Sequence, residues 1–330
     1  PAIVGDRPVH ATWLNRIPGA ARHYPKLLPL MTSALRRFDL SRFDLVLSSS
    51  HACAKNVRTP AGTLHVCYCH TPMRYAWDES LLEGEEIGRA TRLALPLLLR
   101  RLRRQDVEGA RGPDAILANS QHVARRIRQH WGQEAEVVNP PVAVERLLAM
   151  PRQEGDYYLV FGRVVPYKRV DLAVGAAMML DRALKVAGDG RALAALRAAA
   201  AADPRVELLG RVSDEQRDRL LSGARALLFP GEEDFGIVPV EAQAAGLPVI
   251  AYGVGGAAET VLDGVTGVLF AEQTAGALAA AIERFEQLAI DTGTVRSNAA
   301  RFGRERFRVE MAGAIERAAA ALDRQLAGAA

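Results

Sequence analysis

Long apolar runs, cysteine pairs and a secretion signal are all missing from this 330-residue sequence. No uninterrupted apolar stretch approaches the roughly 20 residues that a membrane-spanning helix needs. The first residues lack the basic and apolar blocks of a signal peptide. Cys53, Cys67 and Cys69 are an odd number of cysteines and provide no disulfide framework. These features predict a protein of a reducing compartment, in the cytoplasm.

Several common catalytic and metal-binding patterns are missing as well. The sequence has no Gly-x-Ser-x-Gly motif, no phosphate-binding P-loop and no His-Glu-x-x-His pattern. Their absence removes common hydrolase, kinase and metalloprotease interpretations. Cys67, Cys69 and His70 are close in sequence, but a zinc site usually needs a second ligand pair, which the sequence lacks. We therefore expect buried strand cysteines, no bound metal and no cofactor.

The charged residues are distributed unevenly. Residues 1–150 contain 21 Lys and Arg against 14 Asp and Glu, whereas residues 151–330 contain 21 against 24. A basic first half suits a contact with an anionic membrane surface or another polyanion. Nucleic acid is a poorer partner, because the basic residues are not interleaved with aromatic residues that could stack on bases.

Apolar strand-like stretches alternate with amphipathic helical stretches along the chain. This alternation predicts an α/β protein with parallel sheets covered on both faces. The length suggests two domains, which we place at residues 1–148 and 149–310, followed by a final helical segment at 311–330. Strands are expected at 44–48, 63–68, 114–118, 157–161, 184–187, 206–209, 226–229, 248–251 and 267–270. Helices are expected at 93–108, 120–130, from 169, at 191–201, 213–221, 240–245 and 308–326. Ser213 and Gln216 predict a capping box at the start of the helix at 213–221. The proline-containing start (Pro8, Pro18, Pro25, Pro29) and residues 143–155 are expected to be loop and linker.

Two glutamates mark the most informative run of the chain. Glu233 and Glu241 stand eight residues apart, where an apolar strand ends and a helix begins. Ligands of open α/β sheets bind at that edge, outside the carboxyl ends of the strands. Carboxylates accept paired hydrogen bonds from vicinal hydroxyls, and the N–H groups of a helix start bind phosphate oxygens. Hydroxyls and phosphates together describe a nucleotide-sugar.

The run from Gly231 to Glu241 resembles the E-x7-E motif of retaining glycosyltransferases of family 4, which have the GT-B fold. Further matching pieces follow the family's order, namely Phe161-Gly162-Arg163, Tyr167-Lys168-Arg169, Ala187-Gly188-Asp189-Gly190 and Gly255-Gly256-Ala257-Ala258-Glu259. The resemblance runs from about Asp44 to the C-terminus. It implies two Rossmann-like domains with a cleft between them and a last helix that crosses back to the first domain. Because relatives open with a strand and a glycine-rich loop, we expect the N-terminal domain to be incomplete.

The resemblance also implies roles for individual residues. Arg163 and Lys168 would bind the donor pyrophosphate, where fixed cations stabilise the charge of the leaving group. Glu241 would hold the ribose hydroxyls, and Glu233 would face the sugar. The backbone amides of Phe235, Gly236 and Ile237 would complete the cradle, and Gly188 would lie in the donor site. The Asp-x-Asp motif of the other large transferase fold is absent, so these cations would take the place of a divalent metal.

His70 opens the string His70-Thr71-Pro72-Met73-Arg74-Tyr75, directly after a predicted strand. By resemblance His70 contacts the transferred sugar, and the string is similar to bacterial mannosyltransferases of polysaccharide and O-antigen assembly. A histidine with a purely structural role is the alternative. Ser49, Ser50 and His51 end another strand and are weaker candidates for contacts to the acceptor. Glu259 is either a site residue or a carboxylate at a helix start.

Arg100, Arg101, Arg103 and Arg104 lie beside leucines on one predicted helix. Such a basic amphipathic helix is suited to rest on anionic headgroups near a lipid-linked acceptor, although a solvated helix face is equally compatible with the pattern.

The sequence thus predicts a metal-independent, retaining glycosyltransferase that moves a hexose to a glycan or lipid-linked acceptor. Mannose from GDP-mannose is the expected donor. Two alternatives remain: a non-catalytic nucleotide-sugar-binding protein, or another GT-B activity such as a phosphorylase or epimerase.

Overall fold

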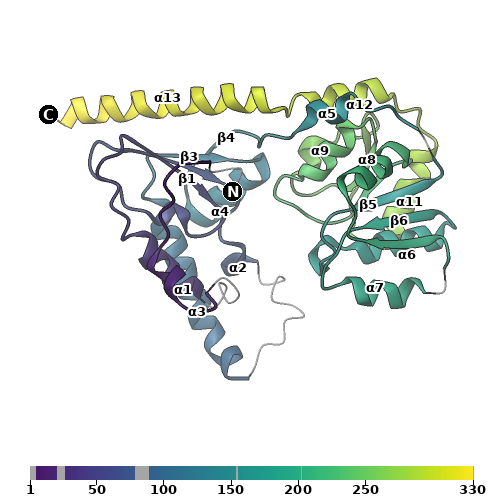
Figure 1. The fold of residues 1–330 in the computed structure, drawn as a ribbon, viewed down its shortest axis with the longest axis horizontal. Helices are drawn as coiled ribbons and strands as arrows, with labels where there is room; N and C mark the ends of the chain where they lie inside the picture. Colours follow the sequence, from purple (N-terminus) through teal and green to yellow (C-terminus); the bar gives the residue numbers. More distant parts are fainter. Residues whose placement is uncertain (1–4, 21–26, 79–88, 154, 202, 330) are drawn as a thin grey trace. The chain divides into compact units, whose positions relative to one another are not determined.

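The computed structural model describes residues 5–20, 27–78, 89–153, 155–201 and 203–329 (Figure 1). It divides into two compact units. Unit 1 comprises residues 1–119, 123–137 and 312–330, and unit 2 comprises residues 120–122 and 138–311. No helix among the described residues is long and apolar enough to cross a membrane.

Unit 1 is built on a four-stranded parallel sheet in the order β1-β2-β3-β4. Its strands are β1 (Leu45–Ser50), β2 (Leu64–Cys69), β3 (Ala115–Ala118) and β4 (Glu136–Val137). Its helices are α1 (Leu28–Leu35), α2 (Arg74–Trp77), α3 (Arg89–Ala110) and most of α4 (Gln121–Trp131), with short 3₁₀ turns η1 (Trp13–Arg16) and η3 (Ala54–Asn56). One face of the sheet packs against α4 through buried residues such as Cys67, Cys69 and Ile127.

Unit 2 contains a six-stranded, all-parallel sheet in the order β10-β9-β8-β5-β6-β7. Its strands are β5 (Tyr157–Phe161), β6 (Ala183–Ala187), β7 (Val206–Gly210), β8 (Leu227–Phe229), β9 (Val249–Tyr252) and β10 (Gly267–Phe270). Its helical elements are α5 (Val144–Leu148), η5 (Pro166–Lys168), α6 (Val170–Met179), α7 (Leu193–Ala200), α8 (Asp214–Gly223), α9 (Ile237–Ala244), α10 (Ala257–Thr260), α11 (Ala275–Glu286) and α12 (Thr292–Ala300). The last helix, α13 (Arg304–Ala329), is grouped with unit 1 from Ala312 onward, where Arg317 pairs with Glu136.

Both faces of the unit 2 sheet are buried, as a parallel sheet requires. Alternate residues of a strand point to opposite faces, so Tyr158 and Val160 of β5 pack with α6, α7 and α11. Leu159, which lies between them, packs with α5, α8, α9 and α12 on the other face. The predicted α/β class with two parallel-sheet domains is therefore confirmed.

The nine predicted strands lie within two residues of the observed ones, and each predicted helix is present, whereas β4 and several helices were not predicted. Residues 143–155 were expected to be a linker, yet they contain α5, whose Val144 and Leu147 are buried; residue 154 lies outside the described residues. The loop expected near Pro29 is the first turn of α1, where a proline needs no N–H partner, and Pro25 lies outside the described residues. Helices α11 and α12 were not predicted.

The capping box predicted for α8 is confirmed. Ser213 Oγ accepts the backbone N–H of Gln216, and the Gln216 side chain accepts the backbone N–H of Ser213. The helix expected to start at Arg169 begins one residue later, because Arg169 has a left-handed backbone with φ of +49°.

Two glycines of unit 2 differ in how much space surrounds them, and this difference can be tested by substitution. A Cβ at Gly188 would lie 1.7 Å from the Gly162 carbonyl oxygen, and Gly188 has φ of +151°. A Cβ at Gly276 in α11 would meet nothing within 4 Å. We expect Gly188→Ala to lower the free energy of unfolding by more than about 2 kcal/mol, and Gly276→Ala to raise it by up to about 1 kcal/mol. Denaturant unfolding of both variants checks this; equal stability of the two would contradict the packing.

Candidate functional site

The path of the chain through the unit 2 sheet creates a switch point beside β5. From β5 the chain adds β6 and then β7 on one side, and it returns to place β8 on the other side of β5. At such a point the loops after the two strands diverge and leave room for a ligand at the carboxyl ends. The loop with Arg163 and Lys168 follows β5, and the loop with Glu233 follows β8. Topology alone therefore makes these two loops neighbours.

Lys168 and Glu233 meet at this switch point. The Lys168 Nζ lies 2.6 Å from Glu233 Oε1, and both side chains are largely buried, with 15% and 21% exposure. The two loops also touch through their backbones, since a Cβ on Gly231 would lie 2.7 Å from Lys168 Cα. The pair leaves an ammonium and a carboxylate side by side at the edge where ligands of such sheets bind. A phosphate could replace the carboxylate as partner of the ammonium, and a hydroxyl could replace the ammonium as partner of the carboxylate.

Gly188 lies against the loop after β5. The loop after β6 presses on the loop after β5, because the Cβ positions of Gly188 and Gly190 fall 1.7 Å and 2.2 Å from the carbonyl oxygens of Gly162 and Val164. A Cβ on Gly162 would lie 3.3 Å from Lys168 Nζ. The lack of a side chain at Gly162 thus leaves space beside the ammonium, and Gly188 and Gly190 allow the loop after β6 to pack closely on the loop that carries it.

Arg163 is placed differently from Lys168. Its side chain is exposed, and its Nη2 donates to the Tyr167 hydroxyl at 2.8 Å. Arg169 points to a neighbour on its own helix, with its Nη2 3.0 Å from Asp171 Oδ2. The structure therefore brings Lys168, and neither of the two arginines, into an ion pair with Glu233 among the described residues.

The segment Phe235-Gly236-Ile237 forms the start of α9. Gly236 is the N-cap residue and has φ of +83°, a conformation that favours glycine. The Phe235 side chain is buried and packs edge-on against Phe302, with ring centroids 5.7 Å apart. A Cβ on Gly256 would lie 2.2 Å from Phe235 Cα, and Gly256 N donates to Glu233 O at 2.7 Å. The α9 start is thus fixed from both sides, and the N–H groups at a helix start favour an anion.

Glu241 lies one turn further along α9 and lines a cavity of about 610 Å³. Its companions there include Arg146 of α5 and Asp214, Arg217 and Asp218 of α8. Burial raises the pKa of Glu241 above the ordinary glutamate value, and the attraction of Arg217 and Arg146 offsets only part of this effect. The residues around Glu241 were not predicted; the capping box that fixes the start of α8 was the only sequence signal near them.

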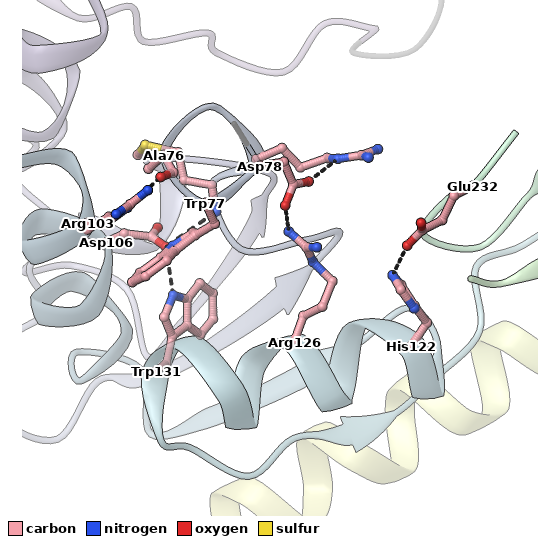
Figure 2. A network of polar contacts seen from close by, with 11 residues as sticks. Ala76, Trp77, Asp78, Arg103, Asp106, His122, Arg126, Trp131 and Glu232 are labelled. Carbon is pink, nitrogen blue, oxygen red and sulfur yellow. Dashed lines mark hydrogen bonds and ion pairs between the residues drawn. The ribbon is translucent and has the colours of Figure 1, made fainter. Parts of the chain in front are cut away.

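Residues 120–122, at the start of α4, belong to unit 2 and contact three acidic residues of that unit. Ser120 Oγ donates to the Asp234 carbonyl at 2.5 Å. The Glu259 carboxylate accepts the amides of Gln121 and His122 at 2.8 Å and 2.7 Å. His122 Nε2 lies 3.5 Å from Glu232 (Figure 2). Glu259, which lies in the first turn of α10, thus accepts two backbone amides at the start of α4. Its role as a site residue stays a prediction.

His70 lies in unit 1, at the carboxyl edge of β2. Its Nε2 is 2.8 Å from Ser49 Oγ, and its ring stacks edge-on against Tyr68 at 5.3 Å between centroids. The Asn119 side chain donates to the His70 carbonyl at 3.0 Å. Burial lowers the pKa of His70 below the ordinary histidine value, and the nearby His51 lowers it further. The imidazole is therefore neutral at pH 7.

The three cysteines are buried, Cys67 and Cys69 within β2 and Cys53 next to η3. Among the residues that the structure describes, no group of three His, Cys, Asp or Glu side chains is placed to hold a metal ion.

Both halves of the chain are similar to known glycosyltransferases. Residues 4–146 match the family model of Glycosyltransferase Family 4, and residues 150–305 match that of Glycosyl transferases group 1. An uncharacterized glycosyltransferase of Methanocaldococcus jannaschii is 33% identical over 161 residues, 47% of this chain and 45% of the relative. A D-inositol 3-phosphate glycosyltransferase of Nocardiopsis dassonvillei is 32% identical over 231 residues, 61% of this chain and 51% of the relative. The chain thus spans about half the length of these curated relatives.

Solved structures are similar over nearly the whole chain. Anabaena HepE in complex with UDP-glucose has a TM-score of 0.63 at 19% identity, covering 93% of this chain and 84% of that one. The lipopolysaccharide outer core galactosyltransferase WaaB has a TM-score of 0.61 at 18% identity, covering 91% and 82%. With two parallel-sheet, Rossmann-like units and these matches, the chain has the GT-B fold. Each half is similar to a glycosyltransferase domain model.

Proposed function

We propose that the chain is a retaining glycosyltransferase that moves a hexose from a nucleotide-diphosphate-sugar to a glycan or lipid-linked acceptor. The observation that carries the proposal is the Lys168–Glu233 pair at the switch point of unit 2. A sugar diphosphate carries anionic phosphates next to neutral hydroxyls, which is the chemistry that an adjacent ammonium and carboxylate can bind. The matches to two glycosyltransferase domain models support the same conclusion.

In this proposal each part of the site binds one part of the donor. The Lys168 ammonium and the exposed Arg163 guanidinium bind the pyrophosphate, together with the amides at the start of α9. Glu233 accepts hydrogen bonds from sugar hydroxyls, and Glu241 accepts them from the ribose. The cations stabilise the diphosphate as it leaves, and they do so best in a site that excludes water.

The transfer step needs no strong protein base. The acceptor oxygen forms a bond to the sugar's anomeric carbon on the face that the leaving phosphate oxygen vacates, so the configuration is retained. The bond between the anomeric carbon and the phosphate oxygen breaks, and a donor phosphate oxygen takes the acceptor's proton. His70 is neutral, and thus it hydrogen-bonds a sugar hydroxyl without placing a positive charge beside the reacting carbon.

We propose mannose from GDP-mannose as the donor, on the resemblance of the string from His70 to Tyr75 alone. A UDP-hexose is the competing candidate, because the similar Anabaena structure contains UDP-glucose.

A groove in unit 1 supports a contact with anionic lipid. We define the basic groove as the cavity of about 690 Å³ lined by Arg36, Leu97, Arg100, Arg101, Arg104, Gln105 and Glu108. Leu97 is 74% exposed, and the ion pair between Arg104 and Glu108 on this surface is 3.5 Å long and exposed. Arg103 of the predicted cluster is not part of the groove, because its Nε donates to the Ala76 carbonyl. We propose that the basic groove rests on anionic headgroups near a lipid-linked acceptor.

The donor site is tested by paired lysine variants. Lys168→Met should lower kcat/KM by about 10²–10³, the usual effect of removing one donor that stabilises a developing charge. Lys185→Met is the matched control, since Lys185 also faces a glutamate, Glu207, at 3.7 Å. Turnover is measured with GDP-, UDP- and ADP-sugars, and product NMR reports the anomeric configuration. Equal activity of the two variants would overturn the site assignment.

Glu241 is expected to lower the stability of the folded chain while it contributes to nucleotide binding. Because its pKa is raised in the folded state, the folded chain keeps the proton to a higher pH than the unfolded chain, and unfolding free energy falls as pH rises through that interval. Glu241→Gln removes this loss of stability. The melting temperature of the variant minus that of the parent should therefore be larger at pH 7 than at pH 4. The nucleotide affinity of the variant should be lower than that of the parent. A difference in melting temperature that is independent of pH would show that Glu241 is not destabilised by burial.

The basic groove is tested by flotation with phosphatidylglycerol vesicles. Replacing Arg100, Arg101 and Arg104 with glutamine should lower partitioning by about 100-fold at low salt, from about 1 kcal/mol per arginine at an anionic surface. The control replaces three exposed arginines elsewhere, Arg197, Arg219 and Arg324. An equal loss in both triple variants would indicate a general charge effect and contradict the proposed surface.

A further inference from the structure

A fully buried ion pair lies in unit 1, outside the donor site. Asp106 of α3 is 0% exposed and Lys55 of η3 is 1% exposed, and Lys55 Nζ lies 2.5 Å from Asp106 Oδ1. Removing two charges from water is costly, and their attraction compensates only when further hydrogen bonds satisfy both groups. An apolar pair of similar volume would often be as stable. The pair therefore calls for an explanation beyond the stability of the fold.

Half of the groups that bind the Asp106 carboxylate come from one short segment. Its Oδ2 accepts the indole N–H groups of Trp77 and Trp131, each at 2.7 Å, and the Met73 amide at 3.3 Å (Figure 2). Lys55 Nζ also donates to the Ala52 carbonyl at 2.7 Å and lies over the Trp131 ring at 4.7 Å. Two of the four groups bound to the Asp106 carboxylate, Met73 and Trp77, thus belong to the residues that directly follow His70.

The remainder of this segment is held by two arginines. Arg103 Nε donates to the Ala76 carbonyl at 2.7 Å, and its guanidinium lies 5.4 Å from the Trp77 ring centroid. Arg126 Nη2 lies 2.8 Å from Asp78 Oδ1, and Figure 2 draws the two side chains pointing toward each other. We define residues 70–78 as the anchored segment. Its members His70, Met73, Ala76, Trp77 and Asp78 each make a contact that holds the segment in place. His70 therefore lies at the end of a backbone with little freedom.

We propose that Asp106, charged and held by Lys55, is a positioning residue that fixes the anchored segment and thereby the orientation of His70. The proposal rests on the proposed function, in which His70 contacts the transferred sugar. Among the described residues, the Asp106 carboxylate is bound by Lys55, Met73, Trp77 and Trp131, none of which belongs to the proposed donor site. One oxygen of its carboxylate, Oδ2, accepts three hydrogen bonds. A neutral amide oxygen in its place would accept the same hydrogen bonds less strongly.

The two tryptophans provide a matched test. Trp77→Phe and Trp131→Phe each remove one indole hydrogen bond of the same length to the same oxygen, but only Trp77 lies in the anchored segment. Both variants should lose similar stability. Only Trp77→Phe should lower kcat, by about tenfold or more, because a small displacement of a group near the reacting atoms slows the reaction strongly. The nucleotide affinity of both variants should equal that of the parent. Equal kcat values in the two variants would overturn the proposal.

A second measurement does not depend on activity. In a ¹⁵N-labelled chain the indole N–H signals of Trp77 and Trp131 should lie downfield. Asp106→Asn should shift both of these signals and leave the indole N–H signal of Trp13 unchanged. The His70 imidazole signals should shift in Trp77→Phe and Asp106→Asn but not in Trp131→Phe or Glu108→Gln, the last being an exposed carboxylate of the same helix. If His70 shifts as expected but no donor is turned over, the proposed function fails and the positioning role stands. If His70 does not respond, the positioning role fails.

Discussion

The pairing of Lys168 with Glu233 is the interaction on which the functional account depends. A parallel sheet whose chain reverses its direction of growth must leave two diverging loops at the carboxyl ends of adjacent strands. In unit 2 these strands are β5 and β8, and the two loops carry opposite charges that meet at 2.6 Å. The charges stabilise each other in the absence of a ligand. They also mark the place where a molecule with both phosphates and hydroxyls can bind without leaving either charge unpaired.

Close backbone packing keeps these loops in place. Gly188, Gly231 and Gly256 lie where any Cβ would collide with the backbone of a neighbouring loop. Rigid loops of this kind allow charged groups to be held in position before a ligand arrives, which is how electrostatic stabilisation avoids the cost of reorganisation. Unit 1 uses a different device, because there a buried carboxylate gathers several donors around one oxygen.

The sequence was sufficient to predict the architecture and insufficient to predict the contacts. Alternating apolar strands gave the parallel sheets to within one or two residues, and Ser213 with Gln216 gave the start of α8. Helix α5 was missed because five residues are too few to show a helical period. Pro29 was interpreted as a loop residue although a proline is well tolerated in the first helical turn. Lys55 and Asp106 are 51 residues apart, and only the packing of η3 against α3 brings them together. The roles assigned to the donor-site residues remain predictions.

The structure of the chain with bound GDP or UDP is the most direct test of the central claim. The account predicts the diphosphate within hydrogen-bonding distance of Lys168 Nζ and of the amides at the start of α9, with the ribose hydroxyls on Glu241. It also predicts that the ammonium turns from Glu233 toward the phosphate. A nucleotide bound away from the loops after β5 and β8, with the Lys168–Glu233 pair unchanged, would contradict it.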